Sequence, residues 1–169
     1  RRHLRRQRSG GRLRLLHRCG RHRHQRHHPQ KDQDMELLFK DLSYQIAGAA
    51  FEVHKDLGCG FLEKVYQEAF AIALQERGVH FEREKKIQIS YHQRPLSTPY
   101  ICDFCVENKI IVELKSVQKI EEIHKAQLIN YLKATGMKLG ILINFNEMII
   151  HPIRLINPTN ILNTKTIRK

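Results

Sequence analysis

The sequence predicts an α/β fold in which helices flank a mixed β-sheet, with the elements in the order α-α-β-β-β-α-β-β. Three observations support this class. Two amphipathic helical stretches open the globular part, a hairpin with a short turn follows at 100–115, and a nearly continuous apolar run occupies 139–145. Such a run is typical of a strand that is covered on both faces, so helices are expected on both sides of the sheet.

The first half of the globular part predicts two helices and then a strand. Apolar residues recur with helical spacing over 41–55, and two glycines around Cys59 break the backbone after them. A second helix is expected over 61–76. A strand follows at about 85–91, and the loop 92–99, which contains two prolines, leads into the hairpin.

The hairpin at 100–115 carries charged residues at the end of otherwise apolar strands. Its turn is expected at 107–109, and its return strand ends in Glu113, Leu114 and Lys115. Because the side chains of a strand alternate between two faces, Glu113 and Lys115 project from one side and Leu114 from the other. Chemistry is the first explanation to test where a buried pattern is broken at one place.

A helix is expected over 120–134 and two further strands at 139–145 and 148–154. Gln127 lies near the middle of the apolar stripe of this helix, and Tyr131 lies one turn further on. A glutamine on a core face costs about 1–3 kcal/mol unless it finds a hydrogen-bond partner. Gln127 is therefore expected to have a hydrogen-bond partner beneath the helix.

The basic charge of the chain is concentrated at its N-terminal end. The chain has 169 residues, enough for one domain, and a net charge of +13. Eleven Arg, one Lys and two Asp give residues 1–34 a charge of +10, which leaves +3 for 35–169. The charge of the whole chain is therefore a poor argument for nucleic-acid binding.

The composition also divides the chain into segments. Residues 1–34 are expected to be disordered, because they lack the apolar pattern of a core. Since the first Met is Met35, we favour extraneous upstream sequence for this segment over a basic arm that grips phosphates. A single globular domain is expected over 35–158 and a polar tail over 159–169. No apolar run approaches the roughly 20 residues of a membrane span and no signal-peptide pattern is present, so the expected location is cytoplasmic.

Cys102 and Cys105 form a C-x-x-C motif within the first strand of the hairpin. Strand residues three apart face opposite ways, so the two thiols are poorly placed to share a metal ion. Reduced, partly buried cysteines are the favoured interpretation.

The hairpin contains the groups that hydrolysis of a phosphodiester requires. Mg²⁺ prefers oxygen ligands such as one or two carboxylates, which Asp103 and Glu113 supply, and the Leu114 carbonyl could add another oxygen. Lys115 could orient water and offset developing charge. An isolated pattern of this kind is common by chance, and its alternative interpretation is a surface acid and a simple ion pair. The hairpin, the helix after Lys115 and the Gln127–Tyr131 pair together favour a site.

A third acid is expected from the second helix. Glu63 and Glu68 are five residues apart, which is about 140° on a helical wheel, so only one of them should face the site. We favour Glu63, because it lies on the same side as Tyr66 and Phe70. In the alternative interpretation both are surface acids, with Glu63 favoured at the helix start by the macrodipole.

These motifs together resemble a known family. The pattern Gly60-x-x-Glu63-x-x-Tyr66 is similar to the signature of the GxxExxY proteins, a branch of the PD-(D/E)XK nuclease superfamily, and the resemblance covers nearly all of 35–158. It implies a restriction-endonuclease-like core. It also implies a metal-dependent catalytic set and a supporting Q-x-x-x-Y element of the RecB-like branch, which correspond here to Asp103, Glu113 and Lys115 and to Gln127 and Tyr131. Cys102 stands where the superfamily has Pro.

The sequence therefore predicts a nuclease that uses Mg²⁺, with Mn²⁺ as a substitute, and acts on nucleic acid, with DNA favoured over RNA. The alternative is a binding module for nucleic acid or a protein partner, built on the same fold without turnover. The roles of two histidines are left open. His124 could contact a phosphate or be structural, and a structural role is favoured for His54.

Overall fold

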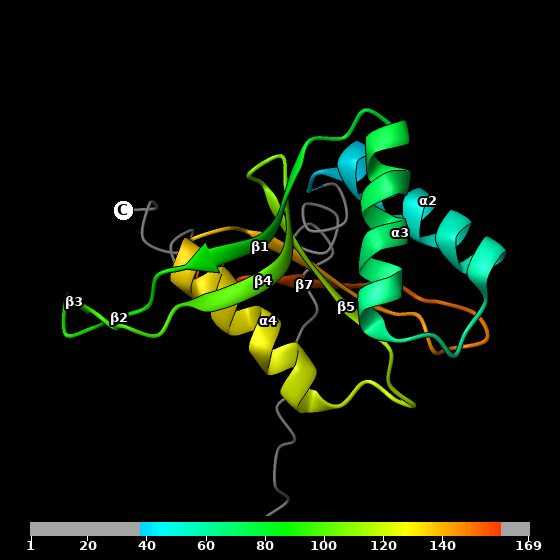
Figure 1. Cartoon of the computed structure of the whole chain (residues 1–169). Coiled ribbons are helices and arrows are strands. Elements are labelled where there is room, and N and C mark those ends of the chain that lie inside the picture. Colours follow the sequence, from blue (N-terminus) through cyan, green and yellow to red (C-terminus); the bar gives the residue numbers. More distant parts are fainter. Residues whose placement is uncertain (1–37, 160–169) are drawn as a thin grey trace, which may run out of the picture.

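The computed structural model of the chain describes residues 38–159 (Figure 1). Their regular elements confirm an α/β fold with a mixed sheet flanked by helices. The helices are α2 (Lys40–Leu57), α3 (Glu63–Glu76) and α4 (Glu122–Thr135), and the strands are β1 (Phe81–Ile87), β2 (Ser90–Tyr91), β3 (Arg94–Pro95), β4 (Tyr100–Val106), β5 (Ile110–Lys115), β6 (Leu139–Asn144) and β7 (Ile153–Ile156).

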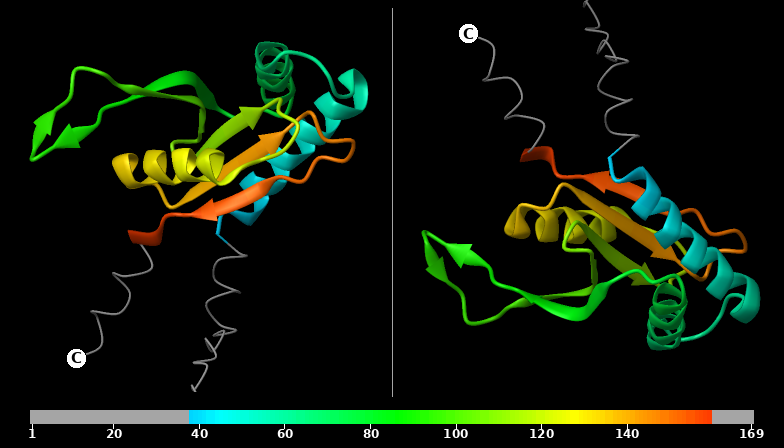
Figure 2. Two further views of the ribbon diagram at one scale, coloured as in Figure 1. Left: turned by 90° about the horizontal axis from the view of Figure 1, so that it is seen from below. Right: turned by 90° about the horizontal axis from the view of Figure 1, so that it is seen from above.

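The main sheet has five strands in the order β1-β4-β5-β6-β7. Its centre is the parallel pair β5–β6, which α4 connects, and every other pair is antiparallel. All residues of β6 are buried, as expected for a strand between two layers of helices. One apolar cluster joins the sheet to α2 and α3, and a second joins it to α4, so the helices cover opposite faces (Figure 2).

The turn between β4 and β5 lies where the sequence predicts it. Glu107 and Asn108 both adopt positive φ angles, 51° and 52°, and Lys109 N–H donates to the Val106 carbonyl at 2.9 Å. Two left-handed residues in succession match the twist of the adjoining strands, which makes a tight hairpin favourable. This turn fixes the register that brings the two strands of the site together.

Tyr66 ties the start of α3 to the sheet. Its ring is fully buried and stacks on Phe145, with 4.6 Å between the ring centroids. Its hydroxyl donates to the Gly58 carbonyl at 2.8 Å and accepts from Phe61 N–H at 3.1 Å. Tyr66 therefore fixes the turn that leads into α3 and, with it, the position of Glu63.

Replacing Tyr66 with Phe is expected to lower the free energy of unfolding by about 1–2 kcal/mol, because two backbone groups lose their partner. Urea denaturation monitored by circular dichroism measures the change. The matched control is Tyr44→Phe, since Tyr44 lies on α2 with 80% of its surface exposed. Equal effects of the two substitutions would contradict this role for the Tyr66 hydroxyl.

Three predicted boundaries were wrong. β1 begins at Phe81 rather than 85, because its charged residues lie on an edge strand, where polar side chains are common. The predicted loop 92–99 overlaps the small hairpin β2–β3, which projects beyond the sheet in Figure 2. The last strand, β7, follows a turn that exposes Met148 and Ile149, so it lies later than 148–154.

The prediction that Cys102 and Cys105 face opposite ways was also wrong. Both are buried in the apolar cluster beneath α4. The regular alternation of β4 is therefore interrupted between them, in the stretch where the pairing of β4 with β5 ends at Phe104 and where Glu84 of the neighbouring β1 has a φ of 48°. Burial raises the pKa of the Cys102 thiol to about 12, so this cysteine is held in the thiol form.

Two predictions about the chain ends lie outside the described residues, namely the segment 1–34 and all but the first residue of the tail 159–169. Within 38–159, none of the helices combines the length and the apolar character that a membrane crossing needs.

Candidate active site

The strands β4 and β5 separate at the position of the predicted acids. Their pairing runs from Val106 and Ile110 only as far as Phe104 and Val112. Beyond that point, hydrogen bonds from backbone N–H groups to carboxylate side chains replace the backbone pairing of the two strands. Leu114 N–H donates to Asp103 Oδ2 at 2.8 Å, and Asp103 N–H donates to Glu113 Oε1 at 3.2 Å. The two carboxylates are therefore held at one opening in the sheet.

Lys115 lies beside these acids. Its Nζ is 3.4 Å from Glu113 Oε2 and 4.0 Å from Glu63 Oε1, and only 12% of its side chain is exposed. Leu114 belongs to the opposite cluster, beneath α2 and α3, which confirms the predicted alternation of faces along β5. The ammonium group thus bridges the return strand and the first residue of α3.

The two acids of α3 have different surroundings. Glu63 lies near Lys115, whereas Glu68 is exposed and makes no hydrogen bond or ion pair with any residue of 38–159. Of the two alternatives left open by the sequence, Glu63 is the one that the fold brings to the opening between β4 and β5.

Gln67 is a site residue that the sequence reasoning missed. It is 9% exposed, and its Nε2 donates to Asp103 Oδ1 at 2.9 Å. The signal that could have found it is a glutamine beside Tyr66 on the buried stripe of α3, since a buried amide requires a partner. Together with the Leu114 N–H, Gln67 fixes the orientation of both Asp103 oxygens.

Gln127 and Tyr131 form a polar contact beneath α4. Gln127 Nε2 donates to the Tyr131 hydroxyl at 2.8 Å, and that hydroxyl donates to the Ile101 carbonyl at 3.2 Å. Neither side chain hydrogen-bonds to Asp103 or Glu113 in the described part of the chain. They hold β4 against α4 two residues before Asp103. Burial, helped by the nearby Glu113 charge, raises the pKa of Tyr131 to about 12, so it acts as a hydroxyl donor.

The site has more negative charge than one lysine can offset. Burial and the neighbouring Asp103 raise the pKa of Glu113 to about 8, against the opposing effect of Lys115. Burial also raises the pKa of Asp103, while the Leu114 N–H and Lys115 act in the other direction. Two buried carboxylates that share a site with one lysine fit a hard divalent ion, which takes oxygen ligands and would offset the remaining negative charge.

The carboxylate pair is the main donor set available for such an ion. Among residues 38–159, no three His, Cys, Asp or Glu side chains are grouped as ligands for a metal. Mg²⁺ usually keeps several waters and needs only one or two carboxylates, so the pair satisfies its ordinary requirement.

The raised pKa of Glu113 predicts a pH dependence of stability in the absence of metal. Its pKa rises from 4.5 to about 8 on folding, so the folded state binds this proton more tightly than the unfolded state does. This contribution to stability is complete below about pH 4.5 and is lost as the pH rises through 8. Urea denaturation in EDTA between pH 5 and 9 measures the loss, which should be smaller in Glu113→Gln. Identical declines in the two proteins would contradict the assignment.

Three other polar residues have structural contacts. His54 Nε2 lies 2.8 Å from the Glu147 carbonyl, and His124 Nδ1 accepts from Glu121 N–H at 3.0 Å in the cap of α4. Asn144, which the sequence reasoning missed, is buried and hydrogen-bonds to both backbone groups of Val117. Asn144 thereby fixes the loop that follows Lys115.

Comparison with known proteins supports the resemblance that the motifs suggested at the level of the superfamily. Residues 40–155 match the family model of the PD-(D/E)XK nuclease superfamily. Comparisons with curated proteins and with solved structures give no significant match. The five-stranded mixed sheet with helices on both faces is consistent with a restriction-endonuclease-like fold. Because the family match extends over most of the sequence and ends within the described fold, the chain belongs to the PD-(D/E)XK nuclease superfamily.

Proposed function

We propose that this protein is a metal-dependent nuclease that hydrolyses phosphodiester bonds of nucleic acid, with DNA favoured over RNA. The observation that carries the proposal is the pair of carboxylates, Asp103 and Glu113, held at the opening between β4 and β5 with Lys115 beside them. Membership of a nuclease superfamily supports it. The Gly60, Glu63 and Tyr66 pattern further supports placement in the GxxExxY branch.

Asp103 and Glu113 would hold Mg²⁺, for which Mn²⁺ would substitute, and the Leu114 carbonyl would offer a further oxygen. When bound, such an ion offsets phosphate charge and lowers the pKa of a water molecule. Glu63 would either add an oxygen ligand or accept a proton from the water, since it is the second acid that Lys115 contacts.

The remaining groups of the site position these acids. Gln67 and the Leu114 N–H each occupy one oxygen of Asp103, which restricts the rotation of its carboxylate. Lys115, between Glu113 and Glu63, would orient the attacking water and offset charge that develops on the phosphate. Gln127 and Tyr131 would brace β4, because the Tyr131 hydroxyl bonds to the backbone at Ile101.

A cleavage assay tests this function. Plasmid, linear duplex and single-stranded DNA, together with an RNA oligonucleotide, are incubated with the full chain in Mg²⁺, in Mn²⁺ or in EDTA. We expect cleavage with either ion, none in EDTA, and none from the double variant Asp103→Ala/Lys115→Ala. The matched control is Asp56→Ala/Lys64→Ala, which changes two exposed residues.

Cleavage that persists in the double variant at the rate of the control would contradict the proposal. Absence of cleavage, together with absence of Mg²⁺ or Mn²⁺ binding at millimolar concentration and intact DNA affinity, would instead indicate a binding module on a nuclease fold.

A further inference from the structure

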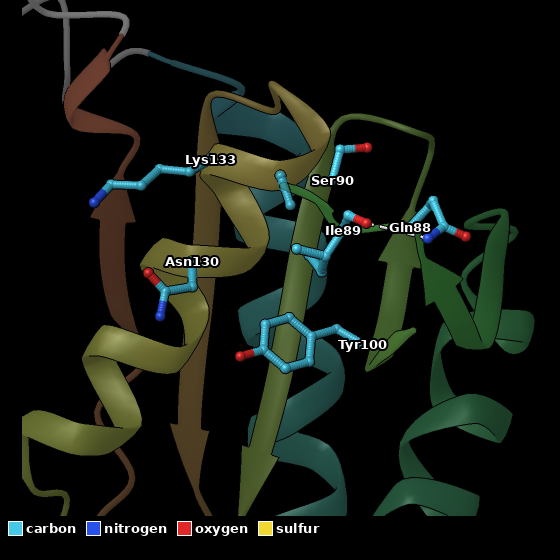
Figure 3. Close-up of a pocket in the computed structure, with 7 residues that line it drawn as sticks. Gln88, Ile89, Ser90, Tyr100, Asn130 and Lys133 are labelled. Atoms are coloured by element: carbon cyan, nitrogen blue, oxygen red, sulfur yellow. Dashed lines mark hydrogen bonds between the residues drawn. The ribbon is translucent and has the colours of Figure 1, made fainter. Parts of the chain in front are cut away.

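A cavity of about 490 Å³ lies on the α4 side of the β1–β4 pair, outside the carboxylate site. Figure 3 shows the side chains that line it, which come from α4, from the start of β4, from the segment that joins β1 to β2 and from the first residue of β2. We refer to it as the Tyr100 cavity. Its volume lies in the range of sites for small organic ligands, roughly 300–1,000 Å³.

Tyr100 offers an aromatic surface in this cavity. The side chain is 44% exposed although it begins a strand of the main sheet. Its ring packs against the edge of Tyr131, with 5.3 Å between centroids and 83° between planes. The Gln127 bond holds Tyr131 in turn, so the Tyr100 ring has a fixed support. A partly exposed aromatic ring of this kind is suited to stacking with a nucleobase.

The polar groups around the ring suit a nucleotide. None of the residues that line the Tyr100 cavity is acidic, and Lys133 of α4 brings a positive charge to its rim, with the ammonium group directed away from the Tyr100 ring in Figure 3. Lys133 and Asn130 are exposed and make no hydrogen bond or ion pair within 38–159. A free ammonium group matches a phosphate, and a free amide matches the edge of a base, which carries both donors and acceptors.

The hairpin β2–β3 extends the same surface. Its residues 88–100 include no acid, while Arg94 is exposed at the start of β3. The rings of Tyr91 and His92 lie 4.2 Å apart at the tip, and Tyr91 is 66% exposed. Exposed rings interleaved with basic residues are typical of surfaces that bind single-stranded nucleic acid.

The Tyr100 cavity is connected to the carboxylate site through β4. Tyr100 precedes Asp103 by three residues, which is about 10 Å along an extended strand. Tyr131 supports the first part of this path, because its ring packs on Tyr100 and its hydroxyl bonds to the Ile101 carbonyl, two residues before Asp103. A polynucleotide lying along β4 would therefore meet the cavity and the carboxylates in succession.

We propose that the Tyr100 cavity binds a base and phosphate of a single-stranded polynucleotide beside the bond to be cleaved. This inference rests on the proposed nuclease function and narrows its substrate to single strands. A paired base cannot enter a side cavity without leaving its stack, which costs a few kcal/mol in a duplex and little in a single strand. The cavity thus favours single-stranded regions over intact duplex.

Fluorescence anisotropy in EDTA tests binding without cleavage. Labelled single-stranded DNA, single-stranded RNA of the same sequence, and the DNA duplex are titrated with the full chain and its variants. Tyr100→Ala should weaken single-strand binding by about tenfold or more, while Tyr100→Phe keeps the ring and the affinity. Tyr44→Ala, on the opposite face of the sheet, is the matched control. The DNA and RNA arms identify which strand the cavity accepts.

The charge of Lys133 has a separate readout. Lys133→Ala should lower the slope of log affinity against log salt by about 0.7 for a single strand, whereas Lys55→Ala, an exposed lysine of α2, should leave it unchanged. Comparing variants in the full chain removes the contribution of the +10 charge in residues 1–34, which all of them share.

Unchanged single-strand affinity in both Tyr100→Ala and Lys133→Ala would overturn the inference, as would equal losses for single strand and duplex. These outcomes are distinguishable from failure of the proposed function. Binding that depends on Tyr100 in a protein without cleavage activity would keep the Tyr100 cavity as a single-strand binding site and remove the nuclease proposal. Active cleavage together with unaltered single-strand binding in both variants would remove the inference about the Tyr100 cavity and keep the nuclease proposal.

Discussion

Replacing Glu113 with Gln is expected to lower the rate of Mg²⁺-dependent cleavage by about a hundredfold or more without destabilising the protein. Glutamine keeps the length of the side chain and an oxygen that accepts from Asp103 N–H. It removes the negative charge that would bind the ion. Because Glu113 is only 2% exposed and its charge lacks full compensation, the neutral amide should preserve or improve stability near neutral pH.

The control for this result is Glu68→Gln, the same chemical change at an exposed position on α3. Initial rates with single-stranded and plasmid DNA, measured beside urea denaturation curves, separate loss of chemistry from loss of fold. If Glu113→Gln cleaves as fast as Glu68→Gln, Glu113 has no part in catalysis and the site must lie elsewhere.

Truncation of Phe104 to Ala is expected to have the largest effect on stability, about 3–5 kcal/mol. Phe104 is fully buried in β4, next to Asp103, and its ring meets Phe70 of α3 and Phe81 of β1 edge-on. Its removal opens a cavity at the junction of three elements, which the surrounding rings can fill only in part. The total stability of a domain is about 5–15 kcal/mol, so the loss is a large fraction of it.

Urea denaturation gives the free energies for this comparison. Phe51→Ala makes the same truncation on α2 at a side chain that is 49% exposed, and it should cost less than about 1 kcal/mol. Phe104→Leu retains most of the buried volume and provides a measurable intermediate case if Phe104→Ala does not fold. Equal costs for Phe104→Ala and Phe51→Ala would show that the three-ring contact does not stabilise the domain.

The parts of the site that follow from local sequence were predictable. Strand alternation was enough to place Glu113 and Lys115 on one side, and the turn at 107–109 follows from the residues that bound it. Helical spacing likewise placed Gln127 and Tyr131 one turn apart on the same face, where they are hydrogen-bonded. Each of these inferences involves residues on one element or one short connection, where geometry is set by a fixed period.

Features that depend on long-range contacts could not be predicted in this way. The bond of Gln67 to Asp103 joins residues 36 positions apart, and nothing in the pattern of α3 says which strand it meets. The early end of the β4–β5 pairing could not be predicted either. Beyond Phe104 the backbone hydrogen bonds between the strands are replaced by bonds to carboxylates, which form only in the folded site. The alternation rule also failed for Cys102 and Cys105, which lie in one buried cluster of the folded protein.

The most direct test of the metal site is calorimetric titration of Mn²⁺ into the wild-type chain and into the double variant Asp103→Asn/Glu113→Gln. Residues 1–34 contain six His that can bind Mn²⁺ in both proteins, so the difference between the two titrations is the informative quantity. We predict a binding event in the wild type that is missing in the double variant. Identical titrations would contradict the assignment of Asp103 and Glu113 as the metal ligands of this nuclease-superfamily protein.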